Sequence, residues 1–324
     1  MNVLCDRHHS GLYHSLQLLG DRLGWSIYTP GGMAWSDAGY WNFGKRSYGD
    51  DRLGRQFLNL GEFDPEFPDR PTPTVTLEQA QAMDWDYVMA TVDDNQEGLA
   101  RFAAEKGARY LLHVGNTNQF IDHTLNPLIL NASEMPGGIV IGEEFDSDGM
   151  FAYSAPTNRT TVTSFVNCLP EICHDHNRLA ESVDAIKANF DTRIHGISGP
   201  DGNLKPIGAI AQVMRDSGWA LHEKPQGDGY GHVLHYWAAI GRPLIGRGGH
   251  YAPKMGYVYW RDLETCIDLD KHDLPQAIEL IREISANPAR HEAMCRTIRA
   301  VFDGQTDWAR DADRVAELVG MVAV

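Results

Sequence analysis

The stretch WALHEKPQGDGYGHVLHYWAAIGRPLI, residues 219–245, decides the fold class of this chain. Its apolar start, 219–223, is typical of a short buried strand, and residues 232–240 can form a helix. Between them the backbone can bend sharply at three glycines, which are Gly227, Gly229 and Gly231. A Gly-Arg-Pro sequence then ends the helix, and residues 243–245 begin a second apolar run. The pattern predicts a strand, a glycine turn, a helix and another strand.

Ligand chemistry is expected in the glycine turn, because the first N–H groups of a helix have no partner within the helix. These groups and the partial positive charge of the helix N-terminus suit a diphosphate. The backbone donors would come from Gly229, Tyr230, Gly231 and His232. The alternative is the ordinary strand–turn–helix that any α/β protein contains.

The same stretch resembles the donor-nucleotide motif of glycosyltransferases with the GT-B architecture. The resemblance lies in Asp228-Gly229-Tyr230-Gly231, which opens the helix, and in AIGRPLI at 239–245. It implies that Asp228 contacts hydroxyl groups of the sugar or ribose; the alternative is that Asp228 caps the helix. The sequence departs from the motif at Tyr236, where many retaining members have a Glu that binds the donor ribose.

Composition and charge narrow the classes of function. The chain has 324 residues, of which 43% are hydrophobic and 22% are charged, so its length suits two globular domains. Its formal net charge of −16 disfavours non-specific binding to nucleic acid or to anionic membranes. Five cysteines without paired spacing are typical of a reducing cytoplasm. We expect no membrane span, and we interpret Cys173-His174-Asp175-His176 as a loop rather than a metal cluster.

Strands and helices alternate along most of the chain, which predicts two doubly wound, Rossmann-like domains. In the first half we expect strands at 2–6, 25–28, 87–92 and 110–114, and helices at 12–23, 77–83 and 96–106. In the second half we expect further strands at 162–167, 193–197 and 265–269, and helices at 178–189, 207–217, 274–286, 291–302 and 308–319. Residues 29–73 show no sustained period and predict a long loop or irregular excursion. Residues 116–149 give no clear pattern.

The domain boundary is expected near 153–160, where SAPTNRTT interrupts the periodicity. The predicted first domain is 1–155, and the predicted second domain, which would bind the donor, is 156–305. The GT-B resemblance implies that the two domains face a cleft and that the C-terminal helix, within 306–324, crosses back to the first domain.

The beginning of the chain adds a narrower resemblance. The sequence DRHHSGLYHSLQLLGDRLGWSIYTP at 6–30, together with GYW at 39–41, is similar to the start of glycosyltransferases encoded by actinobacterial phages. This resemblance implies an enzyme of the host cytoplasm, monomeric or dimeric, with its acceptor in the first domain.

Candidates for catalysis lie in loops that follow predicted strands. His8 and His9 follow the first strand, where inverting plant-type GT-B enzymes place a catalytic His, and Asp93 and Asp94 follow a later strand and could orient it. An imidazole backed by a carboxylate is a workable base near neutral pH. Alternatively the histidines are loop residues and the aspartates cap the next helix. His113 is a second candidate, or a histidine packed at the end of its strand.

Cations for the leaving diphosphate are expected from Lys224, Arg247 and Lys254. Arg247, directly after a predicted strand, is the preferred candidate. Each could instead be a solvated surface residue. The helix dipole and these cations would stabilise the charge of the leaving diphosphate, which magnesium stabilises in other enzymes, so no metal is expected.

These features predict a glycosyltransferase that takes its sugar from a nucleotide-diphosphate sugar. The alternatives are a non-catalytic nucleotide- or glycan-binding protein of the same fold, or a nucleotide-sugar epimerase. Expected acceptors are a modified base of viral DNA or a virion protein. For DNA, phosphates would contact basic residues in the long loop, where Tyr40, Trp41 or Tyr48 could stack on an extruded base. The basic residues are Lys45, Arg46, Arg52 and Arg55.

Overall fold

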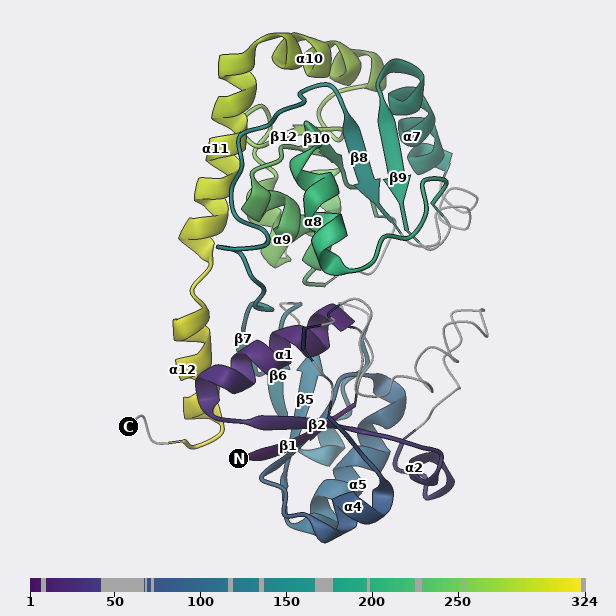
Figure 1. Ribbon diagram of the computed structural model, residues 1–324, viewed down its shortest axis with the longest axis vertical. Helices are drawn as coiled ribbons and strands as arrows, with labels where there is room; N and C mark the ends of the chain where they lie inside the picture. Colours follow the sequence, from purple (N-terminus) through teal and green to yellow (C-terminus); the bar gives the residue numbers. More distant parts are fainter. Residues whose placement is uncertain are drawn as a thin grey trace. The chain divides into compact units, whose positions relative to one another are not determined.

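A computed structural model shows two compact units, and each is an α/β domain (Figure 1). The structure describes residues 1–6, 10–41, 67, 69–70, 73–115, 119–133, 137–166, 177–196, 199–224, 229–252 and 254–321. The first domain comprises Met1–Phe145 and Asp307–Val324, and the second comprises Asp146–Thr306. The chain passes from the first domain to the second between Phe145 and Asp146. This boundary precedes the stretch 153–160, where the sequence pattern predicted it.

The strands of the first domain form one parallel sheet, in the order β3-β2-β1-β4-β5-β6-β7. These strands are β1 (Asn2–Cys5), β2 (Ser26–Pro30), β3 (Thr74–Val75), β4 (Tyr87–Ala90), β5 (Arg109–Val114), β6 (Leu128–Asn131) and β7 (Ile139–Val140). The helices are α1 (Ser10–Leu23), α2 (Ala34–Asp37), α4 (Leu77–Ala82), α5 (Gln96–Lys106) and α12 (Trp308–Leu318), with 3₁₀ turns η1 (Asp93–Asn95) and η2 (His123–Leu125).

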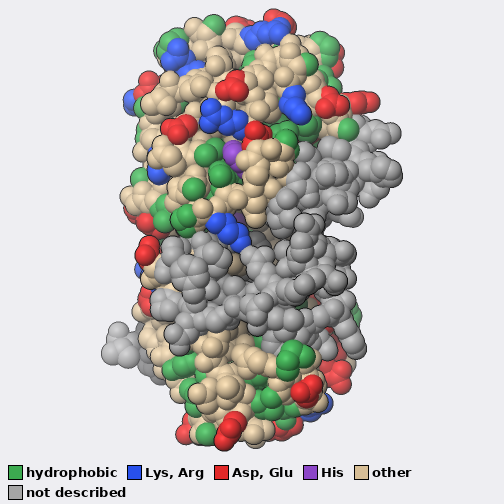
Figure 2. Space-filling view, turned by 45° about the vertical axis from the view of Figure 1, so that its right-hand side comes forward, with side chains coloured by type: hydrophobic (Ala, Val, Ile, Leu, Met, Phe, Trp, Pro, Cys, Tyr) green, Lys and Arg blue, Asp and Glu red, His purple; other side chains and the backbone are tan. Residues whose placement is uncertain are grey.

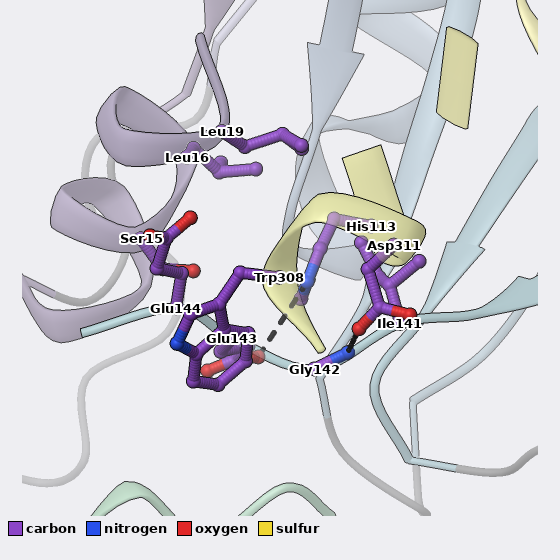
Figure 3. A pocket seen from close by; sticks show the side chains of 10 residues that line it. All are labelled: Ser15, Leu16, Leu19, His113, Ile141, Gly142, Glu143, Glu144, Trp308 and Asp311. Atoms are coloured by element: carbon purple, nitrogen blue, oxygen red, sulfur yellow. Dashed lines mark hydrogen bonds and ion pairs between the residues drawn. The ribbon is translucent and has the colours of Figure 1, made fainter. Parts of the chain in front are cut away.

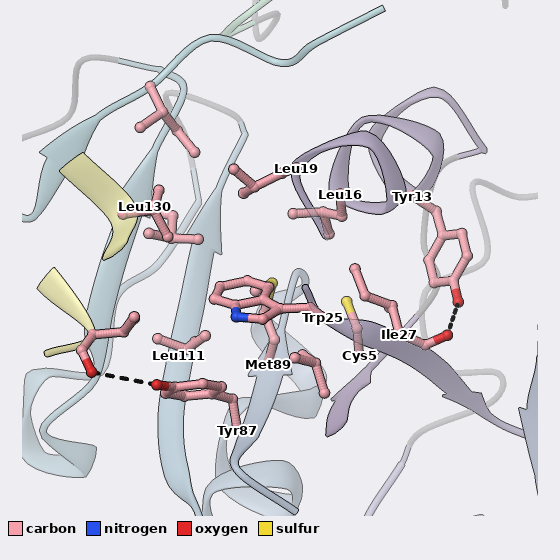
Figure 4. Packing of buried hydrophobic residues seen from close by; sticks show 14 of the residues in the cluster. Cys5, Tyr13, Leu16, Leu19, Trp25, Ile27, Tyr87, Met89, Leu111 and Leu130 are labelled. Atoms are coloured by element: carbon pink, nitrogen blue, oxygen red, sulfur yellow. Dashed lines mark hydrogen bonds between the residues drawn. The ribbon is translucent and has the colours of Figure 1, made fainter. Parts of the chain in front are cut away.

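Apolar side chains cover both faces of this sheet, as a doubly wound domain requires. On one face, α1 and α12 bury Leu16, Leu19 and Val315 against Trp25, and Figure 4 shows the two leucines of α1 above the strands. On the other face, helices α4 and α5 pack their apolar residues against the sheet. The last helix of the chain therefore belongs to the first domain, as expected from the GT-B resemblance.

The second domain contains a smaller parallel sheet in the order β12-β11-β10-β8-β9. Its strands are β8 (Val162–Phe165), β9 (Thr192–His195), β10 (Trp219–Leu221), β11 (Leu244–Gly246) and β12 (Cys266–Asp268). Its helices are α7 (Asn177–Asn189), α8 (Ile207–Arg215), α9 (His232–Ile240), α10 (Leu274–Ala286) and α11 (Pro288–Gln305), with 3₁₀ turns η3 (Gly248–Tyr251) and η4 (Met255–Tyr259). A core of apolar residues from the strands packs against α10.

Helix α9 shows how the local sequence sets its own bounds. It runs over His232–Ile240, the range that the sequence predicted, and glycines in the left-handed conformation stand at both ends. Gly231 has φ 72° at the N-cap, and Gly241 has φ 83° at the C-cap. The N–H of Gly241 binds the carbonyl oxygens of Trp237 and Ala238, which satisfies the last turn. Gly231 and Gly241 thus determine where α9 begins and ends.

The predicted strands and helices are confirmed, with ends that differ by a few residues. The exception is 116–149, where β6 and β7 are too short to give a sequence period. Within the part of the chain that the structure describes, no helix is long and apolar enough to span a bilayer. The same part contains no group of three or more His, Cys, Asp and Glu residues that could hold a metal ion. Cys173-His174-Asp175-His176 lies outside the described residues.

Candidate functional site

The carboxyl edge of the second sheet carries the glycine turn. In open parallel sheets ligands bind outside the carboxyl ends of the strands, where the strand order reverses. Here that reversal lies between β8 and β10, because β9 and β10 flank β8 on opposite sides. Residues 229–231 lead into α9, and Gly231 is the N-cap of this helix. The first N–H groups of α9 therefore lie at the edge where a phosphate would bind.

Aromatic and imidazole rings pack tightly behind this turn. Tyr230 is 2% exposed and stacks on His235 with ring centroids 3.9 Å apart. His235 Nδ1 in turn faces the hydroxyl of Tyr259 at 2.9 Å. The side chain of Tyr230 thus supports the turn, so its expected contribution to donor binding rests on its backbone N–H.

Tyr236 occupies the position where the resemblance leads one to expect a Glu. Its ring stacks on Phe151 at 4.1 Å, and its hydroxyl lies 3.5 Å from His232 Nδ1 on the first turn of α9. Asp228, the other acidic position of the motif, lies outside the described residues. The structure therefore places a packed tyrosine, and not a carboxylate, on this part of α9.

Arg247 follows β11 at the same sheet edge and is held by acidic partners. Its guanidinium forms an ion pair with Glu223, which follows β10, and donates to Ser182 Oγ of α7 at 3.2 Å. Asp270 Oδ1 lies 3.9 Å from Arg247 Nε. Burial raises the pKa of Glu223 to about 7, although the nearby Arg247 charge opposes this shift. The preferred diphosphate cation is thus paired with a carboxylate that the sequence analysis did not single out.

The two lysine candidates occupy different surroundings. Lys224 follows Glu223 after β10 and is half-buried. Lys254 is buried, with Nζ 3.0 Å from His250 Nε2 and 5.4 Å from the centroid of the Tyr251 ring. Lys224 is therefore at the carboxyl edge beside the glycine turn, whereas Lys254 is enclosed by side chains from its own turn.

In the first domain, a buried His–Glu pair lies beside a small pocket (Figure 3). His113 is in β5, and its Nε2 faces Glu143 Oε1 at 3.5 Å. The two side chains are only 1% and 4% exposed. Helices α1 and α12 form the remaining walls, with Leu16 and Trp308 among the lining residues. The structure thus gives His113 a carboxylate partner, Glu143, from the segment for which the sequence showed no pattern.

His8 and His9 lie outside the described residues, so their relation to Asp93 and Asp94 stays a prediction. The two aspartates stand in η1, which begins three residues after the end of β4, and the N-cap of α5 is Asn95 instead of either of them. The side chain of Asn95 donates to Asp6 Oδ2 at 2.7 Å.

Asp6 is a buried carboxylate directly after β1, and Arg7 separates it from the two histidines. It accepts the N–H of Thr91 at 2.6 Å in addition to the amide of Asn95, and burial raises its pKa to about 6. These two bonds tie the end of β1 to the turn after β4. Its place at the end of a predicted strand, two residues before His8, is visible in the sequence.

Three solved structures of similar size match the chain over nearly its whole length. The Anabaena protein HepE, in complex with UDP and glucose, is 11% identical with a TM-score of 0.64, covering 99% of each chain. An alpha-glucosyltransferase in complex with UDP and a 13-mer DNA containing an HMU base is 9% identical with a TM-score of 0.66, covering 98% of each chain. Sucrose-phosphate synthase from Thermosynechococcus elongatus is 11% identical with a TM-score of 0.57, again covering 98% of each chain.

The chain has the GT-B glycosyltransferase fold. No family model and no curated protein matches the sequence. At identities near one in ten, the likeness to these structures concerns the GT-B fold alone, so the chemistry has to be argued from the residues of this chain.

Proposed function

We propose that the protein is a glycosyltransferase that moves a sugar from a nucleotide-diphosphate sugar to an acceptor hydroxyl. The observation that carries this proposal is the N-terminus of α9, which follows Gly229 and Gly231 at the carboxyl edge of the second sheet. Two structures with the same fold contain UDP, which supports a nucleotide donor. The resemblance of the glycine turn to donor motifs points the same way.

In this proposal the second domain stabilises the leaving diphosphate. The backbone N–H groups of Gly229, Tyr230, Gly231 and His232 donate to its oxygens, and Lys224 and Arg247 supply positive charge. Asp228 accepts hydrogen bonds from hydroxyls of the ribose or the sugar. Because Arg247 is already paired with Glu223, its net charge becomes available to a diphosphate when Glu223 is protonated or moves away.

The first domain contributes the group that handles the acceptor proton. His113 sits at the end of β5 with a carboxylate behind it, which is the arrangement that a general base needs. His8 and His9, with Asp93 behind them, are the second set of candidates for the same task. Substituting each His in turn separates the two sets, because only the base contributes about 10²–10⁴-fold to the rate.

Donor turnover tests the proposal directly. Purified protein is incubated with UDP-, GDP-, ADP- and dTDP-sugars, and release of nucleoside diphosphate is measured with and without added acceptors. We expect slow hydrolysis of at least one donor, and weaker donor binding for Asp228→Ala. Absence of both binding and hydrolysis across the panel would refute the enzyme proposal. An intact bound donor would identify a binding protein, and an isomerised sugar without acceptor would identify an epimerase.

The acceptor that we propose is a base of phage DNA, with a virion protein as the alternative outcome. One matching glucosyltransferase structure contains DNA, which supports the first choice. On the face shown in Figure 2, Lys and Arg side chains of the described residues are interspersed with Asp and Glu. In this proposal the basic loop supplies the phosphate contacts. That loop, with Lys45, Arg46, Arg52 and Arg55, lies outside the described residues.

A gel-shift titration against salt tests the DNA acceptor. Phosphate contacts make binding weaken steeply as salt rises, and Arg52→Ala with Arg55→Ala should reduce that slope by about 2. If neither duplex nor single-stranded DNA binds at low salt, the DNA acceptor is excluded and protein acceptors are tested next.

A further inference from the structure

The two terminal nitrogens of Arg247 differ in what they bind. Within the described residues, both hydrogen bonds of its guanidinium start from Nη1, which donates to Glu223 and to Ser182 Oγ. Nη2 takes part in neither bond, and the side chain of Arg247 is 18% exposed. An oxygen of a diphosphate can therefore bind at Nη2 while Glu223 stays at Nη1.

Glu223, the partner of Nη1, is enclosed by the protein. Its side chain is only 4% exposed, and its oxygen Oε2 is buried. The charged groups that face it are Arg247, after β11, and Asp270, after β12. Helix α7 contributes the neutral hydroxyl of Ser182, and Lys224 follows Glu223 in the sequence. The charge of Arg247 thus compensates a buried carboxylate before any ligand arrives.

A diphosphate at Arg247 disturbs this balance of charge. It adds negative charge beside a guanidinium that already compensates Glu223, and two anions repel strongly where little water separates them. A proton on Glu223 removes this repulsion. Protonation is readily available near neutral pH, because burial already raises the pKa of Glu223 to about 7. The proton comes from the solvent, and no covalent bond of the donor changes.

We propose that binding of the donor diphosphate is coupled to the uptake of one proton by Glu223. This coupling rests on the proposed function, in which Arg247 binds the diphosphate. Glu223 stays at Nη1 as a neutral carboxylic acid, and the full charge of Arg247 then serves the ligand. Glu223 therefore sets the donor affinity without touching the donor.

The direction of the pH dependence follows from this coupling. Below about pH 7 the carboxyl group of Glu223 is protonated before the donor arrives, so binding takes up no proton. Above about pH 7 the proton has to be taken from the solvent, so donor affinity falls as the pH rises.

Isothermal titration calorimetry measures the proton uptake. The probes are UDP-glucose, GDP-mannose, ADP-glucose and dTDP-glucose, whose esterified diphosphates do not titrate between pH 5.5 and 8.5. Each is titrated in buffers of different ionisation enthalpy, because the difference in heat counts the protons bound. For the donor that binds most tightly, we expect uptake of about 0.9 proton at pH 8 and almost none at pH 5.5. Its Kd should rise about eightfold between pH 7.5 and 8.5.

Three variants assign the proton to its residue. Glu223→Gln keeps the size of the side chain but cannot ionise, so uptake should vanish and Kd should stay constant between pH 7.5 and 8.5. Glu223→Asp keeps a carboxylate and should restore the uptake. Asp270→Asn is the matched control, because it also removes a negative charge beside Arg247. The carboxylate of Asp270 is 37% exposed, so water screens it and the uptake should persist in this variant.

The outcomes separate this inference from the proposed function. A wild-type protein that binds none of the four donors refutes both. Donor binding without proton uptake at pH 8 overturns the coupling and leaves the proposed function intact, and this wild-type result does not depend on whether a variant folds. Uptake that persists in folded Glu223→Gln also overturns the assignment, because another group, such as the imidazole of His232, would then take the proton.

Discussion

The two ends of strand β11 carry arginines with opposite surroundings. Arg242 precedes the strand at the amino edge of the second sheet, and Arg247 follows it at the carboxyl edge. Arg242 is fully buried, and its guanidinium donates to neutral groups, the carbonyl oxygens of Ser154, Arg215, Ile240 and Gly241 and the hydroxyl of Ser154. Arg247 faces the carboxylates of Glu223 and Asp270.

The edge of the sheet at which each arginine lies sets the groups that surround it. At the amino edge, the guanidinium of Arg242 is bound by carbonyl oxygens at the C-terminal ends of α8 and α9. It also binds the carbonyl oxygen of Ser154 and thereby links the two helices to the segment that precedes β8. At the carboxyl edge, the cation is held by carboxylates that an anionic ligand could replace. The first arrangement is structural, and the second suits binding.

Arg242→Met gives the largest expected effect. The variant removes the guanidinium that binds four carbonyl oxygens in the domain interior, of which, within the described residues, only that of Ile240 also accepts an N–H, from Ser154. We therefore expect the second domain to lose about 3–5 kcal/mol of unfolding free energy. Urea unfolding followed by tryptophan fluorescence measures this loss. As a control, Arg290→Met removes only a surface pair with Glu283 and should cost under about 1 kcal/mol. Equal losses would break the contrast between the edges.

The pH dependence of stability should also differ between the edges. At the amino edge of β10, His291 binds the carbonyl oxygen of Gly218 at 3.0 Å, and burial lowers the pKa of this imidazole to about 4. The unfolded state then binds more protons, so stability is lost as pH falls from about 6.5 towards 4, by roughly 3 kcal/mol. At the carboxyl edge, Glu223 has its pKa raised to about 7, so its contribution to stability is lost as pH rises from about 4.5 to 7.

Two variants separate these opposite slopes. In His291→Gln the urea midpoint should become less sensitive to acid, whereas in Glu223→Gln the loss of stability between pH 4.5 and 7 should diminish. If both variants change the pH profile in the same direction, the assignment of the slopes to the two edges is wrong.

Arg247→Met should affect binding more than stability. We expect UDP affinity to weaken about tenfold, or about 1.4 kcal/mol, through loss of a charge-assisted bond to the diphosphate. The unfolding free energy should fall by less than in Arg242→Met, because Arg247 is partly open to solvent. Isothermal titration calorimetry with UDP measures the affinity, and exposed Arg261→Met is the control. Unchanged UDP affinity together with a large loss of stability would make Arg247 a second structural arginine.

Local sequence patterns predicted most helices and strands of both domains, apart from α2, β3, β6 and β7. The apolar period of residues 12–23 predicted α1, and the glycines around residues 232–240 predicted the bounds of α9. These signals are local, because a helix end depends on backbone conformation within a few residues. For the same reason, Gly229 and Gly231 predicted where a ligand could approach, and His113 could be selected from its place at a strand end.

The pairing of the candidate side chains depends on contacts between residues that are distant in the sequence. His113 and Glu143 are 30 positions apart in the sequence, and Glu223 and Arg247 are 24 positions apart. Nothing local marks Glu143, which follows a two-residue strand, or shows that the helix at 308–318 holds it through Gly142. Charge and burial depend on neighbours that folding brings together, so the sequence located the edges of the sheets and the packing of the chain selected the partners there.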